Sequence, residues 1–473
     1  MTSLLKGCTP WPEEFVDRYW AAGHWRGTTL DSLLRDWALE YGPRTALVHG
    51  DTRITYANLN RSVNRMAAAF RMRGLRPGQR VVVQLPNVPE RVITVFALMR
   101  AGVVPVLCAL SHREPQVPEI VRITQAIGYV GPATHQGFDH MAMAESIAAQ
   151  WPFLRRVFTL EGPGASSPYG GLTTDPSGCQ YSSLGSLDSP PGPALALSAD
   201  QVALFLLSGD VSEAPRIVPR THNDYAYQAR AAAESVSLNA QDVYLAALPP
   251  DGPVAFGGPG IVGALSAGAT VVLVDDPEPA ACLALIERER VTVAAVPASG
   301  VGTWLDVLPA VQAELRDLRL VQIVGADLSP EAAGRLGVEL GCRLQRVVDM
   351  PEGLLLLTRP DDPQRTVLRT HGRPLSPDDE IRVVDAEGTE VPDGEPGELL
   401  VRGPYTARGY YRAPDQNARS FTGQGHFRTG VLAVRNADGT LVLGRALPTH
   451  PPVSAGLDGP GPPGAPPQTP YRA

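Results

Sequence analysis

A run of glycines is the first feature of the sequence whose residue types and spacing could do chemistry. The segment Gly258-Pro259-Gly260-Ile261-Val262-Gly263 fits the pattern Gly-x-Gly-x-x-Gly, follows an apolar strand and precedes Asp275-Asp276. In dinucleotide-binding proteins such glycines let the backbone approach a pyrophosphate, and a later acidic residue holds a ribose. A single match is a weak signal, so NAD-type binding is a minor alternative that titration with NADH would test.

Cysteine and lysine, the usual nucleophiles and metal ligands, restrict the possible chemistry. The five cysteines are Cys8, Cys108, Cys179, Cys282 and Cys342. Their odd number, their scatter and the lack of a Cys-x-x-Cys pair argue against a zinc site or a disulfide framework, and favour buried thiols in a reducing cytoplasm. The single lysine is Lys6, so a mechanism that needs a lysine within the folded body is excluded.

Length and composition indicate a multidomain globular protein. A chain of 473 residues exceeds the size at which one hydrophobic core keeps growing, so two or three domains are expected. The formal net charge of −8 argues against a nucleic-acid surface. No stretch approaches the roughly 20 apolar residues that a membrane span requires, and the first residues do not form a secretory signal. We therefore expect a cytoplasmic protein with no nucleic-acid or membrane partner.

Most of the chain alternates buried strands with amphipathic helices. One helix is predicted over 90–99, and strands are predicted at 80–85, 103–107, around Val157, and at 201–207, 243–248, 270–274 and 291–296. This alternation predicts a doubly wound α/β architecture with largely parallel sheets. The stretch 161–200 is rich in Gly, Ser and Pro and is predicted to be a surface loop.

The pattern changes near residue 366. Short strands are predicted at 379–384, 397–401, 432–436 and 440–443, with a turn at Asp438-Gly439. These features favour a small antiparallel β-barrel. The expected organisation is an α/β subdomain over 1–190, a second over 191–365, a β-barrel subdomain over 366–445 and a disordered tail over 446–473.

Several ordered blocks carry a resemblance to a known family. They are Thr9–Phe15, Arg18–Trp20, Leu85–Asn87, Pro219–Tyr225, Gly372–Pro377 and much of Gly397–Thr429. Together they resemble the stand-alone adenylation enzymes that activate salicylate or 2,3-dihydroxybenzoate as acyl-AMP, and the similarity extends over roughly residues 8–445. The resemblance implies the large N-terminal part of an adenylate-forming enzyme, with two doubly wound subdomains and a small β-barrel.

The family's phosphate loop reads Ser-Gly-Gly-Thr-Thr-Gly-x-Pro-Lys, in which backbone N–H groups, hydroxyls and the lysine hold the triphosphate. The matching positions here are Ser208, Gly209, Asp210, Val211, Ser212, Glu213, Ala214, Pro215 and Arg216. Two glycines have become carboxylates, and one threonine has lost its hydroxyl. A like charge placed about 4 Å from a phosphate costs about 1–4 kcal/mol, whereas micromolar binding is worth about 8 kcal/mol in total. We therefore expect that ATP and magnesium binding are lost.

Other parts of the resembled nucleotide site differ in the same direction. The family has an aromatic residue and a glycine before Met-x-Glu-Gly, and here these are Val348 and Asp349. Glu352 matches the magnesium-associated glutamate and is retained. The Thr-Gly-Asp that grips the ribose appears as Thr429-Gly430-Val431, so the acceptor carboxylate is gone.

The segment that leads to the family's carboxy-terminal domain also departs from the pattern. Gly444-Arg445-Ala446 matches the start of the hinge and keeps Arg445 at the former ribose site, but Leu447-Pro448 stands where Lys-Asp is expected. In the family the following domain supplies a catalytic lysine. The Pro/Gly-rich continuation here predicts that this domain is lacking.

The resemblance also locates an aryl pocket, in which a His-Asn-Tyr segment normally contacts the acid. The matching stretch here is Pro250-Asp251-Gly252-Pro253-Val254, so the hydroxyl-binding amide is absent. We expect a reshaped apolar pocket bounded by Phe256, Gly257 and Gly258. Five acidic residues replace family residues around the site, namely Asp210, Glu213, Asp251, Asp327 and Asp349.

Three functions remain open from the sequence. The first is an ATP-independent enzyme acting by condensation or cyclisation on an aromatic or carrier-linked intermediate. Its candidate proton-transfer residues are His222, Asp251, Asp349 and Glu352, because a buried acid can acquire a raised pKa. The second is a non-catalytic partner, a pseudoenzyme, that docks an aryl carrier protein or an active ligase. The third is a working aryl-acid AMP ligase. In each case the family analogy points to an aromatic natural-product pathway of the siderophore or nonribosomal-peptide type.

Overall fold

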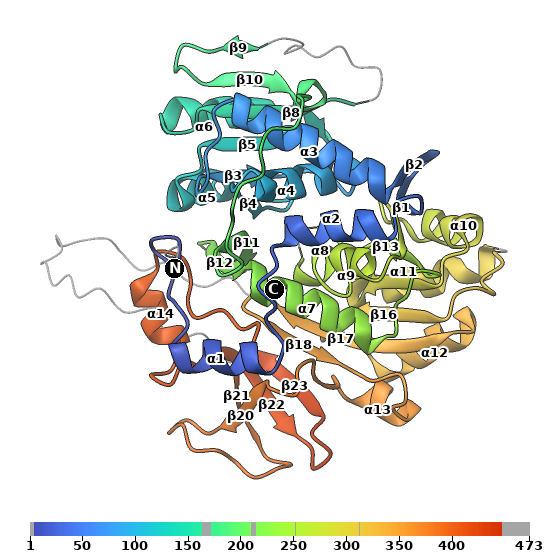
Figure 1. Cartoon of the computed structure of the whole chain (residues 1–473). Coiled ribbons are helices and arrows are strands. Elements are labelled where there is room, and N and C mark those ends of the chain that lie inside the picture. Colours follow the sequence, from blue (N-terminus) through green and yellow to red (C-terminus); the bar gives the residue numbers. More distant parts are fainter. Residues whose placement is uncertain (1–3, 163–171, 210–213, 251, 312, 447–473) are drawn as a thin grey trace, which may run out of the picture.

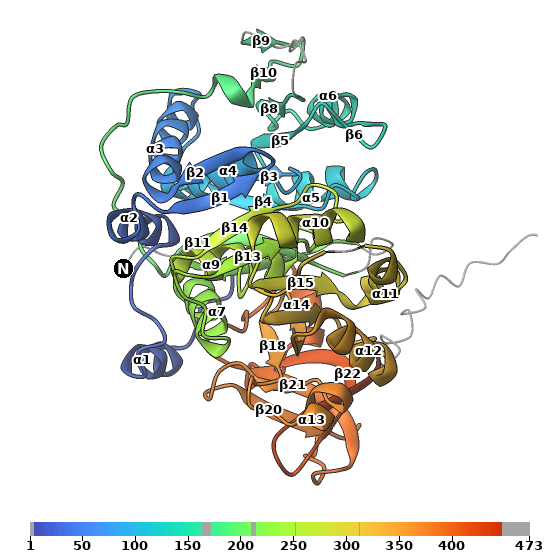
Figure 2. The same cartoon turned by 90° about the vertical axis from the view of Figure 1, so that its right-hand side faces the viewer.

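The computed structural model describes residues 4–162, 172–209, 214–250, 252–311 and 313–446. The described chain forms three parts, which are stacked from top to bottom in Figure 1. Two large sheets with helices against them make up the first and second parts, and a small antiparallel sheet at the base makes up the third. The same stacking is visible from the side in Figure 2.

The first large sheet has eight strands among the described residues, in the order β12-β11-β4-β3-β5-β8-β10-β9. Its strands are β3 (Arg80–Val83), β4 (Val104–Leu107), β5 (Gly128–Pro132), β8 (Arg156–Leu160), β9 (Thr173–Thr174), β10 (Gln180–Ser183), β11 (Val202–Ser208) and β12 (Arg216–Thr221). The helices that accompany it are α3 (Tyr56–Met72), α4 (Pro89–Arg100), α5 (Gln116–Thr124) and α6 (His140–Gln150), and a short hairpin joins β6 (Thr134–His135) to β7 (Phe138–Asp139). The central strands β3, β4, β5 and β8 run parallel. They are apolar along their length because helices cover both faces of a parallel sheet.

The second large sheet has nine strands in the described chain, in the order β19-β18-β17-β16-β15-β13-β14-β1-β2. Its strands are β1 (Thr45–His49), β2 (Thr52–Thr55), β13 (Val243–Ala246), β14 (Thr270–Leu273), β15 (Val293–Pro297), β16 (Leu320–Val324), β17 (Arg343–Met350), β18 (Leu354–Leu357) and β19 (Arg373–Pro374). Its helices are α2 (Leu30–Glu40), α7 (His222–Ser235), α8 (Pro253–Phe256), α9 (Ile261–Ser266), α10 (Pro279–Glu289), α11 (Val301–Val307), α12 (Pro330–Leu340) and α13 (Gln364–Arg369).

The third part is an antiparallel sheet in the order β20-β21-β22-β23. Its elements are β20 (Glu380–Val384), β21 (Pro396–Arg402), β22 (Phe427–Arg435), β23 (Leu441–Ala446) and α14 (Pro414–Ser420). The N-terminal helix α1 (Glu13–Ala21) is attached to this part, because the Arg18 guanidinium donates to Asp378 at 2.8 Å and to Glu380 at 2.9 Å. The chain therefore begins beside the sheet in which its described part ends (Figure 1).

The α/β fold expected from the sequence is confirmed, with three differences in detail. The third part is an open four-stranded sheet in the described residues and not a closed barrel, because four strands are too few to close around a filled interior. The predicted loop 161–200 contributes β9 and β10, which extend the first sheet by pairing with β8. Sheet membership also crosses residue 190, since β11 and β12 lie in the first sheet and β1 and β2 in the second. The tail 447–473 lies outside the described residues.

Close packing accounts for the glycine run at 258–263. A Cβ at Gly258 would lie 2.5 Å from the Cα of Ala229 on α7, and one at Gly260 would lie 2.0 Å from the carbonyl oxygen of Val254. Larger residues cannot fit where α9 begins against α7 and α8. Close packing alone therefore accounts for these glycines.

Candidate functional site

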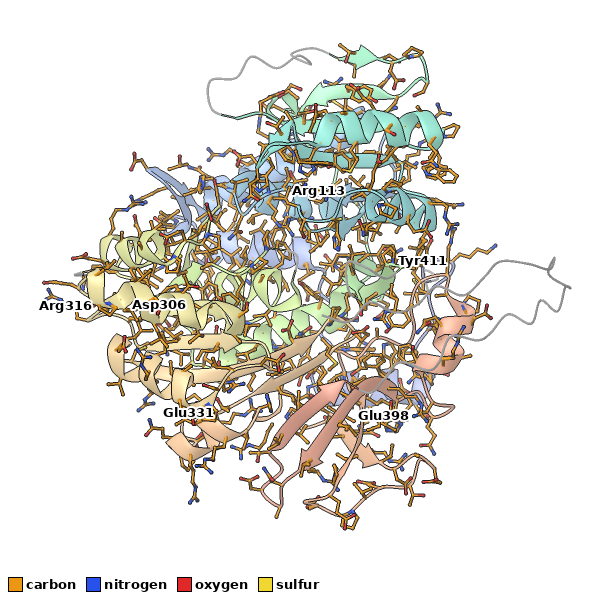
Figure 3. All side chains as sticks on the ribbon, turned by 180° about the vertical axis from the view of Figure 1, so that it is seen from behind. Arg113, Asp306, Arg316, Glu331, Glu398 and Tyr411 are labelled. Atoms are coloured by element: carbon orange, nitrogen blue, oxygen red, sulfur yellow. The ribbon has the colours of Figure 1, made fainter. Side chains whose placement is uncertain are left out.

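A cleft of about 790 Å³ lies where the β11–β12 edge of the first large sheet, the end of β17 in the second and the small sheet meet. It is lined by Ser208, Arg216, Met350, Pro351, Glu352, Ala386, Glu398, Tyr410, Gln416, Arg419, Ser420, Phe427, Arg428, Thr429 and Gly430. Five sequence segments therefore meet here. They are the end of β11 with the start of β12, the end of β17, the loop after β20 with β21, the region of α14, and β22. In Figure 3 the labelled Glu398 lies on the small sheet, and Tyr411 lies on the same side of the molecule.

Glu352 forms the best-connected corner of the cleft. Its Oε1 accepts hydrogen bonds from the Ser208 hydroxyl and from the Tyr410 hydroxyl, the latter at 2.7 Å. The side chain is only 4% exposed, so each hydrogen bond acts in a region of reduced dielectric. The structure thus brings together Ser208 and Glu352, two residues predicted from the sequence. We call this group of three residues the Glu352 corner.

The backbone around Glu352 explains how this corner is held. Gly353 has φ +103°, and a Cβ there would lie 2.0 Å from the carbonyl oxygen of Tyr405. The Glu352 carbonyl accepts from the backbone N–H of Ala407 at 2.7 Å. The turn after β17 is therefore clamped against the segment 405–407, which also leads to Tyr410.

The described part of the cleft contains three guanidinium groups, those of Arg216, Arg419 and Arg428. Arg216 lies over the ring of Tyr410 at 5.7 Å from its centroid, and Arg428 donates to Glu398 at 2.5 Å. Two of these cations, Arg419 and Arg428, come from α14 and β22 and lie outside the segment that matches the phosphate loop. The loop residues Asp210, Val211, Ser212 and Glu213 lie outside the described residues, so their effect stays a prediction.

The segment that the family resemblance assigns to the ribose lies on β22. The Thr429 hydroxyl donates to the Leu399 carbonyl at 2.8 Å and accepts from the backbone N–H of Val431 at 3.1 Å. Val431 is partly exposed and pairs with Ala446 in the sheet. Its side chain has no acceptor for a ribose hydroxyl. Arg445 lies on β23, but its side chain is outside the described part of the structure.

The expected aryl pocket centres on α8, which contains Pro253, Val254 and Phe256 and is flanked by Gly252 and Gly257. Val254 is 1% exposed and Phe256 is fully buried. The Phe256 ring lies 6.2 Å from the ring of Phe96 on α4. Phe256 therefore belongs to the core and does not border an open apolar pocket as expected, because α8 packs directly on α4 and α9.

Asp349 and Val254, predicted independently as parts of the nucleotide site and of the aryl site, are in contact. Burial raises the pKa of the Asp349 carboxyl to about 6, and the nearby backbone N–H of Val254 lowers this pKa to a lesser extent. The dominant cause is burial, which disfavours the charged form. Asp349 is thus the predicted acid with a distinctly altered proton affinity.

The remaining predicted acid–base residues lie elsewhere. His222 is 3% exposed and its Nδ1 accepts from the backbone N–H of Leu30 at 3.2 Å. Burial lowers the pKa of His222 to about 4, so the neutral ring joins α7 to α2 away from the cleft lining. Asp327 is exposed beyond β16. Asp251 lies outside the described residues, and its predicted role is unchanged.

Comparisons with known proteins agree with this geometry. The family described as "AMP-binding enzyme" matches residues 34–411. The chain belongs to the AMP-binding enzyme family. It is 38% identical to a 2,3-dihydroxybenzoate-AMP ligase of Bacillus subtilis over 94% of this chain and 80% of that protein. It is 39% identical to a salicyl-AMP ligase / salicyl-S-ArCP synthetase of Mycobacterium tuberculosis over 93% of this chain and 76% of that protein. Among solved structures, apo MbtA of Mycobacterium smegmatis superposes with a TM-score of 0.85 at 39% identity, over 94% of this chain and 80% of that one.

Four residues that line the cleft were not predicted as site residues from the sequence, namely Glu398, Tyr410, Arg419 and Arg428. All four lie within the stretch Gly397–Thr429 that carried the family resemblance, so the sequence offered a signal for the segment. Which of its side chains reach the cleft depends on how α14 and β22 pack, and the sequence does not show this.

The described residues contain neither a metal site nor a membrane-spanning helix. They contain no group of three or more His, Cys, Asp or Glu side chains placed to hold a metal ion. Within the same residues, no helix is long and apolar enough to cross a membrane.

Proposed function

We propose that this AMP-binding enzyme relative serves an aromatic natural-product pathway by binding an aromatic or carrier-linked intermediate, without forming acyl-AMP in the ordinary way. In this proposal ATP and magnesium are not its cofactors. Asp349 and Glu352 are its candidate proton-transfer groups, and its partner is a small aromatic molecule or an aryl carrier protein.

The observation that carries the proposal is Val431. It occupies the β22 position at which the resembled enzymes grip both ribose hydroxyls with a carboxylate, and it has no hydrogen-bonding side-chain atom. A hydrogen bond to a charged group contributes about 1.5–3 kcal/mol. Loss of two such bonds removes a large share of the roughly 8 kcal/mol that micromolar binding requires. Nucleotide affinity in the millimolar range is the expected result.

Charge supports the same conclusion. The Asp349 carboxylate replaces a residue without charge, and Asp210 and Glu213 add two more acids to the sequence of the phosphate loop. Each like charge near 4 Å from a phosphate would cost about 1–4 kcal/mol. The three cleft arginines oppose this effect in part, which makes Val431 the stronger argument.

The relatives support the pathway and the partner class. The proteins of similar sequence carry names that refer to 2,3-dihydroxybenzoate, salicylate and an aryl carrier protein. Another relative, 41% identical over 92% of this chain, is named a 2-hydroxy-7-methoxy-5-methyl-1-naphthoate–CoA ligase from Streptomyces carzinostaticus. These names favour an aromatic ligand for this chain as well.

A second candidate function is that of a working aryl-acid AMP ligase. The Glu352 corner favours it, because the glutamate is retained and ordered by Ser208 and Tyr410. The guanidinium groups of the cleft also suit a polyphosphate. This candidate competes directly with the first, and one assay separates them.

The deciding experiment is ATP–pyrophosphate exchange with a panel of aryl acids that includes salicylate and 2,3-dihydroxybenzoate. We expect no exchange above background for the wild-type chain. Val431→Asp should bind Mg-ATP at least about 10-fold more tightly by calorimetry, a gain of about 1.4 kcal/mol. Leu432→Asp adds the same charge at the next position of β22 and should show no gain. Exchange clearly above background in the wild type would replace the first function with the second.

A further inference from the structure

A small cavity of about 180 Å³ lies where helices α2, α7 and α9 meet (Figure 1). None of its described lining residues also lines the cleft. The apolar part of its wall consists of Leu30, Leu33, Trp37, Ala226, Ala229 and Val262. An apolar cavity of roughly 150 Å³ is large enough to hold benzene. The cavity therefore has room for one aromatic ring.

The segment before α2 forms one wall of this cavity, and it is fixed against α7. The backbone N–H of Gly27 donates to Asn223 Oδ1 at 3.0 Å. The His24 ring packs on the Tyr227 ring with 4.4 Å between centroids, and the Tyr227 hydroxyl donates to Ser376 Oγ at 2.7 Å. Asn223 and Tyr227 are only 3% and 5% exposed. Because this wall is ordered by the protein itself, a ligand does not have to order it on binding.

Two guanidinium groups, those of Arg26 and Arg230, form the cationic part of the lining. Arg230 donates through Nη2 to the carbonyls of Gly23 at 3.3 Å and His24 at 3.2 Å. Its Nε lies 3.7 Å from Glu234, whose side chain is 67% exposed, so this ion pair is weak. Arg26 is exposed, and in the described part of the chain its guanidinium has no hydrogen-bond or ion-pair partner. Both arginines therefore keep donors for an anionic ligand.

We propose that this cavity, which we call the α2–α7 cavity, binds a single-ring aromatic carboxylate of the size of benzoate. The ring packs against Trp37 and Tyr227, and the carboxylate accepts from Arg26 and Arg230. Burial against aromatic and aliphatic walls stabilises the ring. The hydrogen bonds from guanidinium to carboxylate are charge-assisted, so they favour the acid over a neutral ligand of the same shape. This site goes beyond the proposed function and does not depend on whether acyl-AMP forms in the cleft.

Benzoate and benzamide are matched probes, because they share the ring and differ in charge. Titration calorimetry of the full chain at neutral pH should give a Kd for benzoate below about 1 mM, and benzamide should bind at least about 10-fold more weakly. Arg26→Gln removes an exposed cation without disturbing the core, and should weaken benzoate binding by about 5–10-fold. Ala226→Leu places a larger side chain in the cavity and should weaken benzoate binding by at least about 10-fold.

The controls make the same changes on α3, away from the cavity. Arg61 and Ala57 are both exposed there and do not line it. Arg61→Gln and Ala57→Leu should bind benzoate as the wild type does. The proposal is overturned by no measurable binding of benzoate, by equal binding of the two probes, or by unchanged benzoate binding in Arg26→Gln or Ala226→Leu. If Ala226→Leu does not fold, Arg26→Gln decides, because its side chain is exposed. Pyrophosphate exchange tests the cleft, so a failure of the proposed function is detected separately.

Discussion

Asp349 and Glu352 lie only three residues apart on the chain, yet the protein surrounds their carboxylates in different ways. Glu352 receives two side-chain hydroxyl donors on one oxygen, and a glycine turn clamps its backbone. For Asp349, burial raises the pKa to about 6, and nearby backbone N–H groups lower it to a lesser extent. The fold supplies hydrogen-bond donors to the Glu352 carboxylate, whereas ionisation of the Asp349 carboxyl opposes folding because burial disfavours its charge.

The largest expected effect tests whether the Glu352 corner depends on the close packing of the Gly353 backbone against segment 405–407. Gly353→Ala should lower the free energy of unfolding by more than about 3 kcal/mol or prevent folding, because the new Cβ overlaps the Tyr405 carbonyl at positive φ. Gly388→Ala is the matched control, since Gly388 also has positive φ (+83°) but no atom within 4 Å of the added Cβ. Its cost should stay near about 1–2 kcal/mol, the strain of the conformation alone. Urea unfolding measures both, and similar losses in the two variants would contradict the clamp.

The next effect tests whether the ionised Asp349 carboxylate lowers the stability of the fold. A raised pKa means that the folded state favours the protonated acid, so the ionised carboxylate costs stability as pH rises through about 6. Asp349→Asn should therefore stabilise the fold by about 1–3 kcal/mol near pH 8, by about half as much near pH 5 and by little near pH 3, after allowance for its partial exposure. A stabilisation that does not depend on pH would contradict this account.

These two carboxylates also show how far the sequence can predict the structure. The alternation of strand and helix gave β3, β4, β11, β13, β14 and β15 to within a few residues, because buried parallel strands leave long apolar runs. The pairing of β1 with β14, or of β11 with β4, leaves no local signal, so the mixing of segments between the sheets could not be read. Within the site, Glu352 and Ser208 were found because a motif marks each of them. The proximity of Asp349 to Val254 and the positions of Arg419 and Arg428 in the cleft could not be predicted in this way, because they depend on three-dimensional packing.

A smaller effect tests the hydroxyl donors of the Glu352 corner. Tyr410→Phe removes the hydroxyl that donates to Glu352 at 2.7 Å, and should cost about 1–2 kcal/mol of stability because a buried carboxylate loses a partner. Tyr411→Phe is the control, since the neighbouring ring is held by its packing against Phe205 at 4.8 Å between centroids. Its effect should remain within about 0.5 kcal/mol. Equal losses would show that the Tyr410 hydroxyl contributes nothing specific to the Glu352 corner.

The smallest effect concerns the cleft cation Arg428 and the acid that pairs with it, Glu398. Arg428 is partly neutralised by Glu398, and both side chains are accessible to solvent, at 37% and 17%. Glu398→Gln removes the opposing charge and should strengthen binding of tripolyphosphate by about 2–5-fold at low salt, since exposed pairs of this kind are worth about 0.2–1 kcal/mol. The gain should fade as added salt shortens the screening length. Glu387→Gln, which removes an exposed acid from the loop after β20, should leave binding unchanged. If Glu398→Gln had no effect at any salt concentration, the charge of Arg428 would not reach the cleft, and only Arg216 and Arg419 would oppose the acids of the phosphate loop.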